Sequence, residues 1–417
     1  MKKFNTLSST LKSRLIAEFI LNIASQSILP FMALYLTSKI NAIFAGTFLI
    51  VNIIVTFGIT FLGGFIGDHF NRKKIVNIVH ALYAICLIIL SITVNMNGIG
   101  LIIFCSSVFI FELLFALSNP IFEAATMDAI YEEVREYVYQ LEYWMFNIST
   151  ALGMLLGALL YLGHKHLLFL LFLVAMLISW YLFDKYYDVE QVFSENHESR
   201  SPMKRILNNY LTVLKDKYYL LFNLGYMLIL MAELSLNSYV VVRLKEEFDS
   251  FYILGIHIDG VRMFSIIMII NTLVVVTMTF AINKLIQHHS KRLAFLIGGV
   301  LYTVGYGILT SATSFWLLCL VTIIATIGEL IYSPIQNAQR FLMIPNDQRS
   351  TYATVGMVSF YGSKALARFS LILGTIFAPW MMSLYIVVTV IIGFALLFYA
   401  IFYNTKLKRE GKSYVYY

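Results

Sequence analysis

The sequence predicts an all-α integral membrane protein whose chain crosses the bilayer twelve times, in two bundles of six helices. The first observation is composition: 59% of the 417 residues are hydrophobic and only 13% are charged, against about 25% charged residues in soluble domains. The second is that the apolar residues form continuous runs, each long enough to cross a hydrocarbon core of about 30 Å. The third is the longest polar segment, residues 188–217, which separates six runs from six.

The apolar runs are expected to be helices, because strands of a membrane barrel would alternate apolar and polar residues. Basic residues precede the first run, and signal peptides begin in the same way. It has full span length and no small-residue cleavage site, so we interpret it as a retained helix. The predicted spans are residues 13–37, 42–66, 75–95, 99–124, 138–162, 166–187, 218–242, 259–285, 292–312, 315–339, 350–375 and 379–403.

The distribution of positive charge predicts the orientation. Most of the 30 lysines and arginines fall in segments on the side of both termini, and the positive-inside rule places that side in the cytoplasm. We therefore expect a multi-pass plasma-membrane protein, and explain the net charge of +7 by orientation and not by nucleic-acid binding. The predicted domains are an N-terminal six-helix bundle (1–187), a cytoplasmic linker (188–217) with a surface helix near 203–214, and a C-terminal six-helix bundle (218–417).

A weak internal repeat supports two related halves. The fourth predicted span ends in Pro120-Ile-Phe-Glu-Ala and the tenth in Pro334-Ile-Gln-Asn-Ala, and an arginine, Arg135 or Arg349, follows each proline at the same spacing. Halves related by duplication are frequent in transporters. The cysteines lie singly inside apolar runs, so we expect buried hydrophobes and neither a disulfide framework nor a metal site.

Six glutamates lie inside the predicted spans: Glu18, Glu112, Glu123, Glu142, Glu233 and Glu329. A charge at the centre of a bilayer costs about 2.5–3.5 kcal/mol on insertion scales, so such residues are expected to face the bundle interior or a water-filled cavity. Apolar surroundings favour the protonated form of a carboxyl group and bring its titration toward neutral pH. The pattern favours a transporter in which protonation and substrate binding select different states.

The glutamates differ in how strongly they suggest function. Glu329 lies mid-span and is the leading candidate for proton or substrate binding. Glu18 follows Arg14 by four residues, so a simple ion pair on one helix is an equal alternative. Glu142 lies near the end of its span, where a solvated role is an equal alternative.

Two further pairs are assigned to the substrate cavity. Glu112 and Glu123 share one face of the fourth span, although such a pair also serves to satisfy neighbouring spans. Lys364 and Arg368 lie one turn apart in the eleventh span and either bind an anionic group of the substrate or neutralise Glu329. Gly153 and Gly157 in the fifth span are spaced for close helix packing.

The loop between the second and third spans resembles the signature loop of the major facilitator superfamily. Gly64 precedes Asp68 by four residues, and a basic cluster follows, although His69 and Asn71 stand where the family has a basic residue and a glycine. The alternative is an ordinary positively charged turn. The resemblance implies two bundles of the superfamily fold and a conformational latch made by Gly64, Gly67, Asp68, Arg72 and Lys73.

A second resemblance covers most of the chain and concerns the proton-coupled, lincosamide-type multidrug exporters of this superfamily. It rests on Arg14 and on the stretches Gln140–Trp144 with Ala151–Ala158, Gly260–Met263 and Gly328–Pro334. It implies proton-coupling roles for Asp68, Asp128, Glu142 and Glu329. The group's acid in the seventh span falls on Asn237, and Glu233, one turn earlier, is expected to replace it. The antiporter motifs of the fourth and fifth spans are absent.

The expected function is proton-driven export of amphiphilic drugs or lipophilic small molecules by a bacterial transporter, with a role in antibiotic resistance. Protons are the coupling ion and no other cofactor is expected. The expected partners are a small-molecule substrate and membrane lipids, with no nucleic acid, and the expected state is a monomer. The alternative is a proton-coupled transporter of a defined polar solute such as a peptide. An enzyme is not expected, because the sequence shows no zinc-protease, phosphate-loop or nucleophile-elbow motif.

Overall fold

The computed structural model describes residues 4, 7–69, 71–129, 135–187, 213–253, 255–286, 289–344 and 349–404, with the side chains of most of them. The chain forms two compact units. Unit 1 is Met1–Tyr35 with Val51–His197, and unit 2 is Leu36–Ile50 with Glu198–Tyr417. The predicted linker lies outside the described residues up to residue 212, so the predicted domain boundaries and the surface helix stay predictions.

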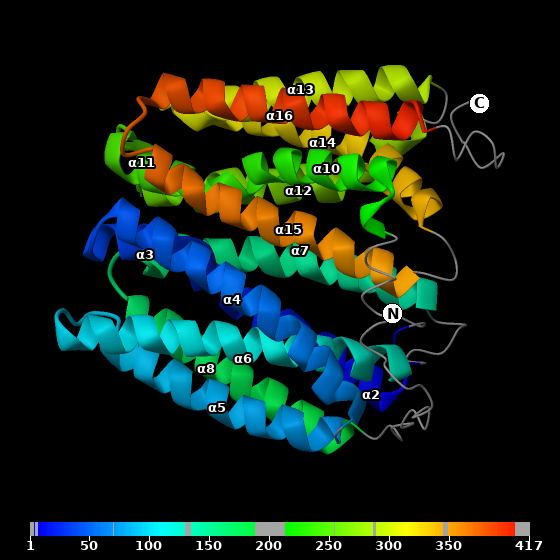
Figure 1. Cartoon of the computed structure of the whole chain (residues 1–417). Helices are drawn as coiled ribbons and strands as arrows, with labels where there is room; N and C mark the ends of the chain where they lie inside the picture. The colour runs from blue at the N-terminus through cyan, green and yellow to red at the C-terminus, as the bar shows by residue number, and fades with distance from the viewer. Residues whose placement is uncertain are drawn as a thin grey trace. The chain divides into compact units, whose positions relative to one another are not determined.

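The first half of the chain is helical throughout the described residues. Its helix α2 packs against α7 and α8, and α5 packs against α6 and α8 (Figure 1). The elements are α2 (Ser9–Ile28), η1 (Leu29–Phe31), α3 (Met32–Lys39), α4 (Ala42–His69), α5 (Arg72–Thr93), α6 (Ile99–Ala129), α7 (Arg135–Leu160) and α8 (Lys165–Tyr186).

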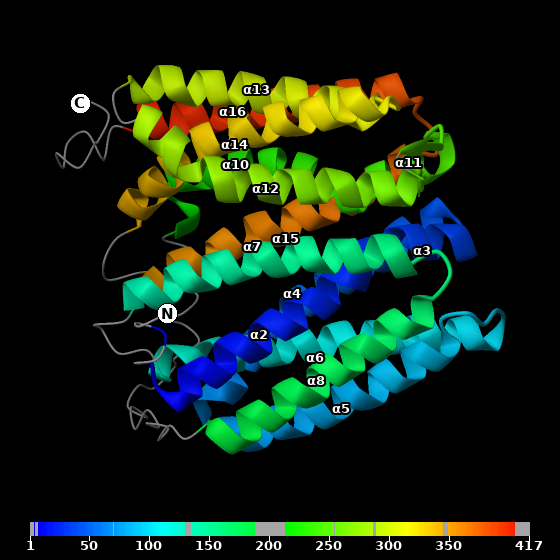
Figure 2. The same ribbon diagram turned by 180° about the vertical axis from the view of Figure 1, so that it is seen from behind.

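The second half repeats the helical pattern and adds a small hairpin. Figure 2 shows α14 beside α12 and α13, and α10 packs against α15 and α16. The elements are α10 (Lys217–Leu234), η3 (Ser235–Asn237), α11 (Tyr239–Glu247), β1 (Phe251–Ile253), β2 (Ile256–Ile258), α12 (Gly260–Ile286), α13 (Lys291–Ser311), α14 (Phe315–Met343), α15 (Arg349–Leu373) and α16 (Pro379–Phe402).

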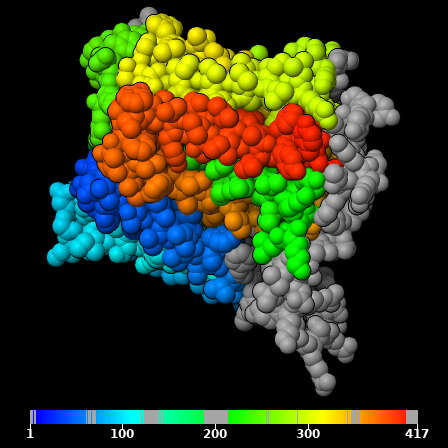
Figure 3. Space-filling view, turned by 45° about the horizontal axis from the view of Figure 1, so that its top comes forward, coloured from blue at the N-terminus to red at the C-terminus, as the bar shows by residue number. Residues whose placement is uncertain are grey.

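Ten helical stretches within the described residues are long and apolar enough to cross a membrane. The other two predicted spans correspond to α7, whose described apolar part is Trp144–Leu160, and to the more polar α15. The prediction of an all-α membrane fold is confirmed. Side by side in Figure 3, α13 and α16 present the apolar surface expected of lipid-facing helices, through exposed residues such as Ile297, Val300, Val304, Val388 and Ile391.

The first and seventh spans are broken, which the prediction of continuous helices missed. In the first span, η1 separates α2 from α3 and contains Pro30, whose ring removes a backbone donor. In the seventh span, η3 separates α10 from α11, and Ser238 leaves the helical region with φ −132° and ψ −99°. The Ser235 hydroxyl donates to the Ala232 carbonyl over 2.6 Å. Serine side chains that bond to nearby carbonyls compete with the helical backbone bonds.

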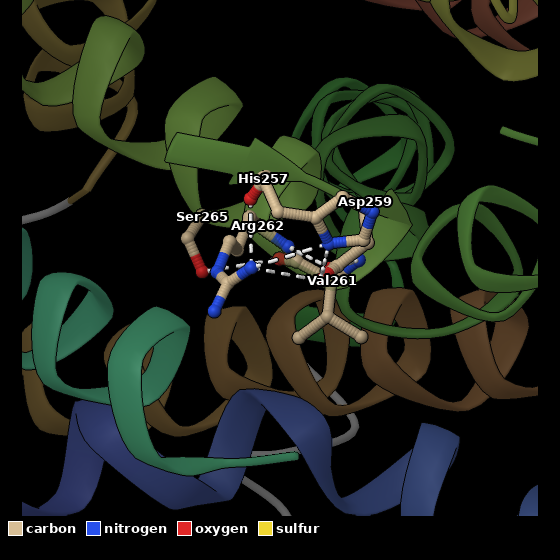
Figure 4. Close-up of polar contacts among 5 residues, drawn as sticks. All are labelled: His257, Asp259, Val261, Arg262 and Ser265. Carbon is tan, nitrogen blue, oxygen red and sulfur yellow. Dashed lines mark hydrogen bonds and ion pairs between the residues drawn. The ribbon is translucent and has the colours of Figure 1, made fainter. Parts of the chain in front are cut away.

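A two-stranded hairpin connects α11 to α12, where a loop was expected. Phe251 pairs with Ile258, and Gly255 makes the turn with a φ of +79°. Asp259 then caps α12, since its Oδ1 accepts hydrogen bonds from the backbone N–H of Val261 and of Arg262 at 3.0 and 2.9 Å (Figure 4). A carboxylate at this position satisfies orphan donors of the first turn.

Candidate functional site

Two acids of unit 2 form the centre of the candidate site. Glu233 lies in the last turn of α10, just before the break in the seventh span, and Glu329 lies within α14, five residues before Pro334. Both side chains are partly buried. The two carboxyl groups interact electrostatically, and no hydrogen bond or ion pair joins either of them to another described residue. The pair is therefore not neutralised by a cation of the described protein.

Tyrosines surround this acid pair. Tyr302 and Tyr306 come from α13, and Tyr332 comes from α14; each of the three interacts electrostatically with both acids. Their rings form one cluster, with centroids 4.5 Å apart for Tyr302 and Tyr306 and 5.4 Å apart for Tyr302 and Tyr332. The acids therefore share this part of unit 2 with aromatic rings, and the faces of such rings attract cations.

Glycines bring the helices of this cluster together. A Cβ atom added at Gly328 would lie 2.5 Å from the backbone nitrogen of Tyr302 and 2.7 Å from the carbonyl oxygen of Gly298. The backbones of α13 and α14 therefore touch at the residue that precedes Glu329. Close contact of this kind requires residues without a side chain, and it fixes Glu329 beside Tyr302.

Lys364 and Arg368 lie in α15, and their two predicted roles, binding an anionic group of the substrate or neutralising Glu329, stay predictions. Arg368 Nη1 donates to the carbonyl oxygen of Asn237 and, over 3.0 Å, to the hydroxyl of Ser238. The reason is the break in the seventh span, which frees a carbonyl that a continuous helix would have used. The Lys364 ammonium lies over the Phe360 ring, 4.5 Å from its centroid.

Asn237 stands where the resemblance places an acid, and it lies in η3 with its side-chain oxygen buried and without a hydrogen-bond partner among the described residues. Glu233, four residues earlier in the seventh span, interacts electrostatically with Glu329. This geometry is compatible with Glu233 taking the place of the acid that the resemblance puts at Asn237. The role of Glu233 in proton coupling stays a prediction.

Unit 1 holds a separate pocket of about 110 Å³ between α2 and α7. Glu18 and Glu142 both line it, with Leu15, Phe19, Asn22, Met145, Phe146 and Ser149. The predicted ion pair of Glu18 with Arg14 is confirmed, at 3.8 Å, and Arg14 also donates to the Phe122 carbonyl over 3.1 Å. Glu142 therefore lies beside a pocket and not only at a solvated helix end.

Gly153 and Gly157 lie where α7 meets α2. Added Cβ atoms would come within 2.6 Å of the Ile23 carbonyl oxygen and 2.8 Å of the Ser27 carbonyl oxygen, respectively. Both atoms belong to a backbone, which cannot give way as a flexible side chain does. The two glycines thus allow the close helix contact that their spacing predicts.

The remaining predicted residues are only partly described. Gly64, Gly67 and Asp68 belong to α4, Arg72 to α5, and Glu123 and Asp128 to α6, but their side chains lie outside the described part. Glu112 is partly buried in α6, and the Lys73 ammonium donates to the Tyr187 carbonyl over 3.4 Å. Asn71 caps α5 by accepting from the Lys74 N–H at 3.0 Å, which explains one departure from the family loop. The latch stays a prediction.

Sequence reasoning missed a buried arginine at the far end of the seventh span. The predicted spans place Arg243 in a loop, but it belongs to α11 and is only 3% exposed. Its guanidinium donates to the carbonyl oxygens of Leu309, Ser311 and Ala312, at 3.4, 3.3 and 2.6 Å. These carbonyls end α13, and a cation there also complements the helix dipole. Charged residues follow Arg243 closely in the sequence, so the segment was assigned to a polar loop and the role of Arg243 was not predicted.

Ten helical stretches among the described residues are long and apolar enough to cross a membrane, and the first and seventh predicted spans are broken, which indicates a polytopic membrane protein. The family profile described as Major Facilitator Superfamily matches residues 14–367. The chain therefore belongs to the Major Facilitator Superfamily, as the signature loop indicated.

Full-length relatives are similar at low identity. The chain is 22% identical over 388 residues to a Na⁺, Li⁺, K⁺/H⁺ antiporter of Planococcus maritimus, covering 88% of this chain and 90% of the antiporter. It is 21% identical over 374 residues to an uncharacterised transporter of the same superfamily from Escherichia coli strain K12, covering 86% and 87% of the two chains. The multi-pass membrane character is thus shared with bacterial proteins.

Solved structures show the same fold. A transporter of the POT family, in complex with a thioalcohol-conjugated peptide, is similar with a TM-score of 0.74 and 14% identity, over 95% of this chain and 99% of that one. A nucleoside transporter is similar with a TM-score of 0.67 and 15% identity, over 93% and 99% of the two chains. At these identities the likeness concerns the fold alone.

Proposed function

We propose that this transporter exports amphiphilic cationic drugs or lipophilic small molecules across the plasma membrane in exchange for protons, by alternating access. The observation that carries the proposal is the pair Glu233 and Glu329, which lies among tyrosines with no protein cation bound to it among the described residues. The multidrug subgroup suggested by the sequence and the antiporter relative both support proton exchange.

The acid pair supplies a physical basis for exchange. Two carboxylates in apolar surroundings repel each other, so the pair gains by binding one positive charge. That charge is either a proton or the cationic group of a substrate, and each weakens the binding of the other. If the protonated pair favours one facing state and the cation-bound pair the other, a proton gradient drives export.

The surrounding residues suit an amphiphilic substrate. Tyr302, Tyr306 and Tyr332 are buried against one another in this structure. In a facing state that opens this cluster, their faces would offer cation–π contacts to a charged nitrogen and apolar area to a ring. Pockets lined by aromatic side chains with a few polar groups are typical of small-molecule sites. A peptide remains the alternative substrate; the solved peptide transporters resemble this chain in fold only and do not favour it.

A second candidate function is exchange of a monovalent metal cation for protons. It is favoured by the relative named as a Na⁺, Li⁺, K⁺/H⁺ antiporter, which matches along nearly the whole chain. The same acid pair would serve, since carboxylate oxygens bind hard cations. The aromatic surroundings favour the organic cation as the first candidate.

The two candidates are separated in inside-out membrane vesicles energised with a proton gradient. Uptake of ethidium, a lipophilic cationic dye, measures organic-cation exchange, and proton release on addition of Na⁺, Li⁺ or K⁺ measures metal-cation exchange. Glu329→Gln and Glu233→Gln are each expected to lower the proton-driven activity by about tenfold, because each removes one of the exchanging charges.

The matched control is Glu246→Gln, which changes an exposed acid at the end of the same span. It is expected to retain the activity of the unchanged protein. Activity that is indifferent to an uncoupler, or equal in Glu329→Gln and in the control, would contradict proton coupling through this pair.

A further inference from the structure

The break in the seventh span leaves backbone carbonyl oxygens, which carry partial negative charge, within the span. The last carbonyls of a helix have no intrahelical donor, and together they carry partial negative charge. Here α10 ends at Leu234, η3 follows, and the chain leaves the helical region at Ser238. The carbonyl oxygen of Asn237 is freed at this point, one turn beyond Glu233.

Arg368 fills this place. Its Nη1 donates to the carbonyl oxygen of Asn237 and to the hydroxyl of Ser238, 3.0 Å away. Its helix, α15, contacts all three parts of the broken span, namely α10, η3 and α11. A guanidinium is charged at every working pH. A fixed positive charge therefore lies at the break, within about one helical turn of Glu233.

In many secondary transporters, the freed carbonyls and C-terminal ends of broken helices coordinate the coupling cation. Here the guanidinium of Arg368 already supplies the positive partner for the freed carbonyl oxygen of Asn237. We propose that Arg368 is a positioning residue that takes the place of a bound coupling cation: it holds the break of the seventh span closed and leaves the proton as the ion that this break couples. This inference rests on the proposed proton coupling and deepens it.

Other groups near Glu233 do not duplicate this charge. Among the described residues, the groups that interact electrostatically with Glu233 are the acid Glu329 on α14, and the tyrosines Tyr332 on α14, Tyr302 and Tyr306 on α13, and Tyr226 on its own helix. Tyrosine side chains are uncharged near neutral pH. Lys364 lies on α15 one turn before Arg368, over the ring of Phe360. Loss of the guanidinium therefore removes the fixed positive charge at the break, about one helical turn along the span from Glu233.

The test compares two substitutions of the same residue. Arg368→Gln keeps a hydrogen-bond donor for the break and removes the charge, whereas Arg368→Lys keeps the charge and loses the fork of donors. Ethidium uptake into inside-out vesicles is measured across a series of pH values, with and without Na⁺. We expect the pH of half-maximal uptake to rise by about one unit in Arg368→Gln, for a charge roughly one turn away, and to stay unchanged in Arg368→Lys.

Sodium gives a second result. It is expected to stimulate uptake by Arg368→Gln, whose break lacks its cation, and not to stimulate the unchanged protein. The control is Arg243→Gln, which removes another buried guanidinium from carbonyls of the same unit but at the other end of α11. It is expected to lower the amount of folded protein without moving the pH of half-maximal uptake.

Either of two results overturns the inference: a pH profile of Arg368→Gln that superimposes on that of the unchanged protein, or sodium stimulation of the unchanged protein. If Arg368→Gln does not fold, Arg368→Lys decides, because a raised pH of half-maximal uptake in that variant contradicts the role of the charge and an unchanged one supports it. Failure of the proposed function is recognised separately, by uptake in the unchanged protein that does not respond to an uncoupler.

Discussion

Replacing Gly328 with alanine perturbs the contact that positions Glu329. The new Cβ atom would lie 2.5 Å from the Tyr302 nitrogen and 2.7 Å from the Gly298 carbonyl oxygen, where ordinary contacts begin at 3.4 Å. All of the atoms approached are backbone, so α13 and α14 must separate by about 1 Å. Overpacking of this kind costs about 1–3 kcal/mol, which corresponds to a fall of several degrees in Tm.

The assay is thermal unfolding of detergent-purified protein, followed by the fraction that elutes as a monodisperse peak, together with ethidium uptake at matched protein amounts. Transport is expected to fall more than stability, because the displacement moves Glu329 away from Tyr302. The matched control is Gly58→Ala in α4, where an added Cβ atom meets nothing within 4 Å. Alanine is the better helix former there, by about 1 kcal/mol. Equal Tm and equal transport for Gly328→Ala and Gly58→Ala would refute the reasoning.

Two further substitutions test structural contacts of the same unit. Arg243→Ala removes the donor to the carbonyl of Ala312 and of its neighbours at the end of α13. Buried groups left without partners cost about 1–3 kcal/mol each, so we expect a lower Tm. A Tm within about one degree of that of the unchanged protein would contradict this expectation. Asp259→Ala removes the cap of α12; loss of such a cap costs about 1 kcal/mol, to be measured by the same unfolding assay, with Asp259→Asn expected to retain most of the stability.

The spans were predictable because length and apolar content decide them directly. A helix must satisfy its backbone bonds internally in lipid, and a run of about 20 apolar residues leaves few other solutions. The predicted limits of 315–339 and 379–403 therefore lie close to α14 and α16. Glu329 was predictable as a candidate for the same reason, since an acid in such a run carries an energetic cost.

The break in the seventh span was not predictable from hydropathy. Serine, leucine and asparagine at 235–237 contain neither proline nor glycine. The Ser235 hydroxyl bonds to a backbone carbonyl at the break, but Thr303 and Thr326 make such bonds within unbroken helices. Arg368 consequently donates to a carbonyl oxygen that a continuous helix would not offer. Its predicted alternative role beside Glu329 stays a prediction. The tyrosines of α13 and α14 lie far apart in sequence, and only their glycine contact brings them to one place.

The two pieces of the seventh span have different neighbours. The longer piece, α10, packs on α15 and α16, whereas α11 packs on α12, is tied by Arg243 to the end of α13, and comes so close to Gly260 that no side chain fits there. The α11 end of the span is therefore tied to α12 and α13, and the α10 end to α15 and α16. Ser235–Asn237 and Ser238 thus divide one span into two pieces held by different helices, and α15, through Arg368, is the helix that bridges them.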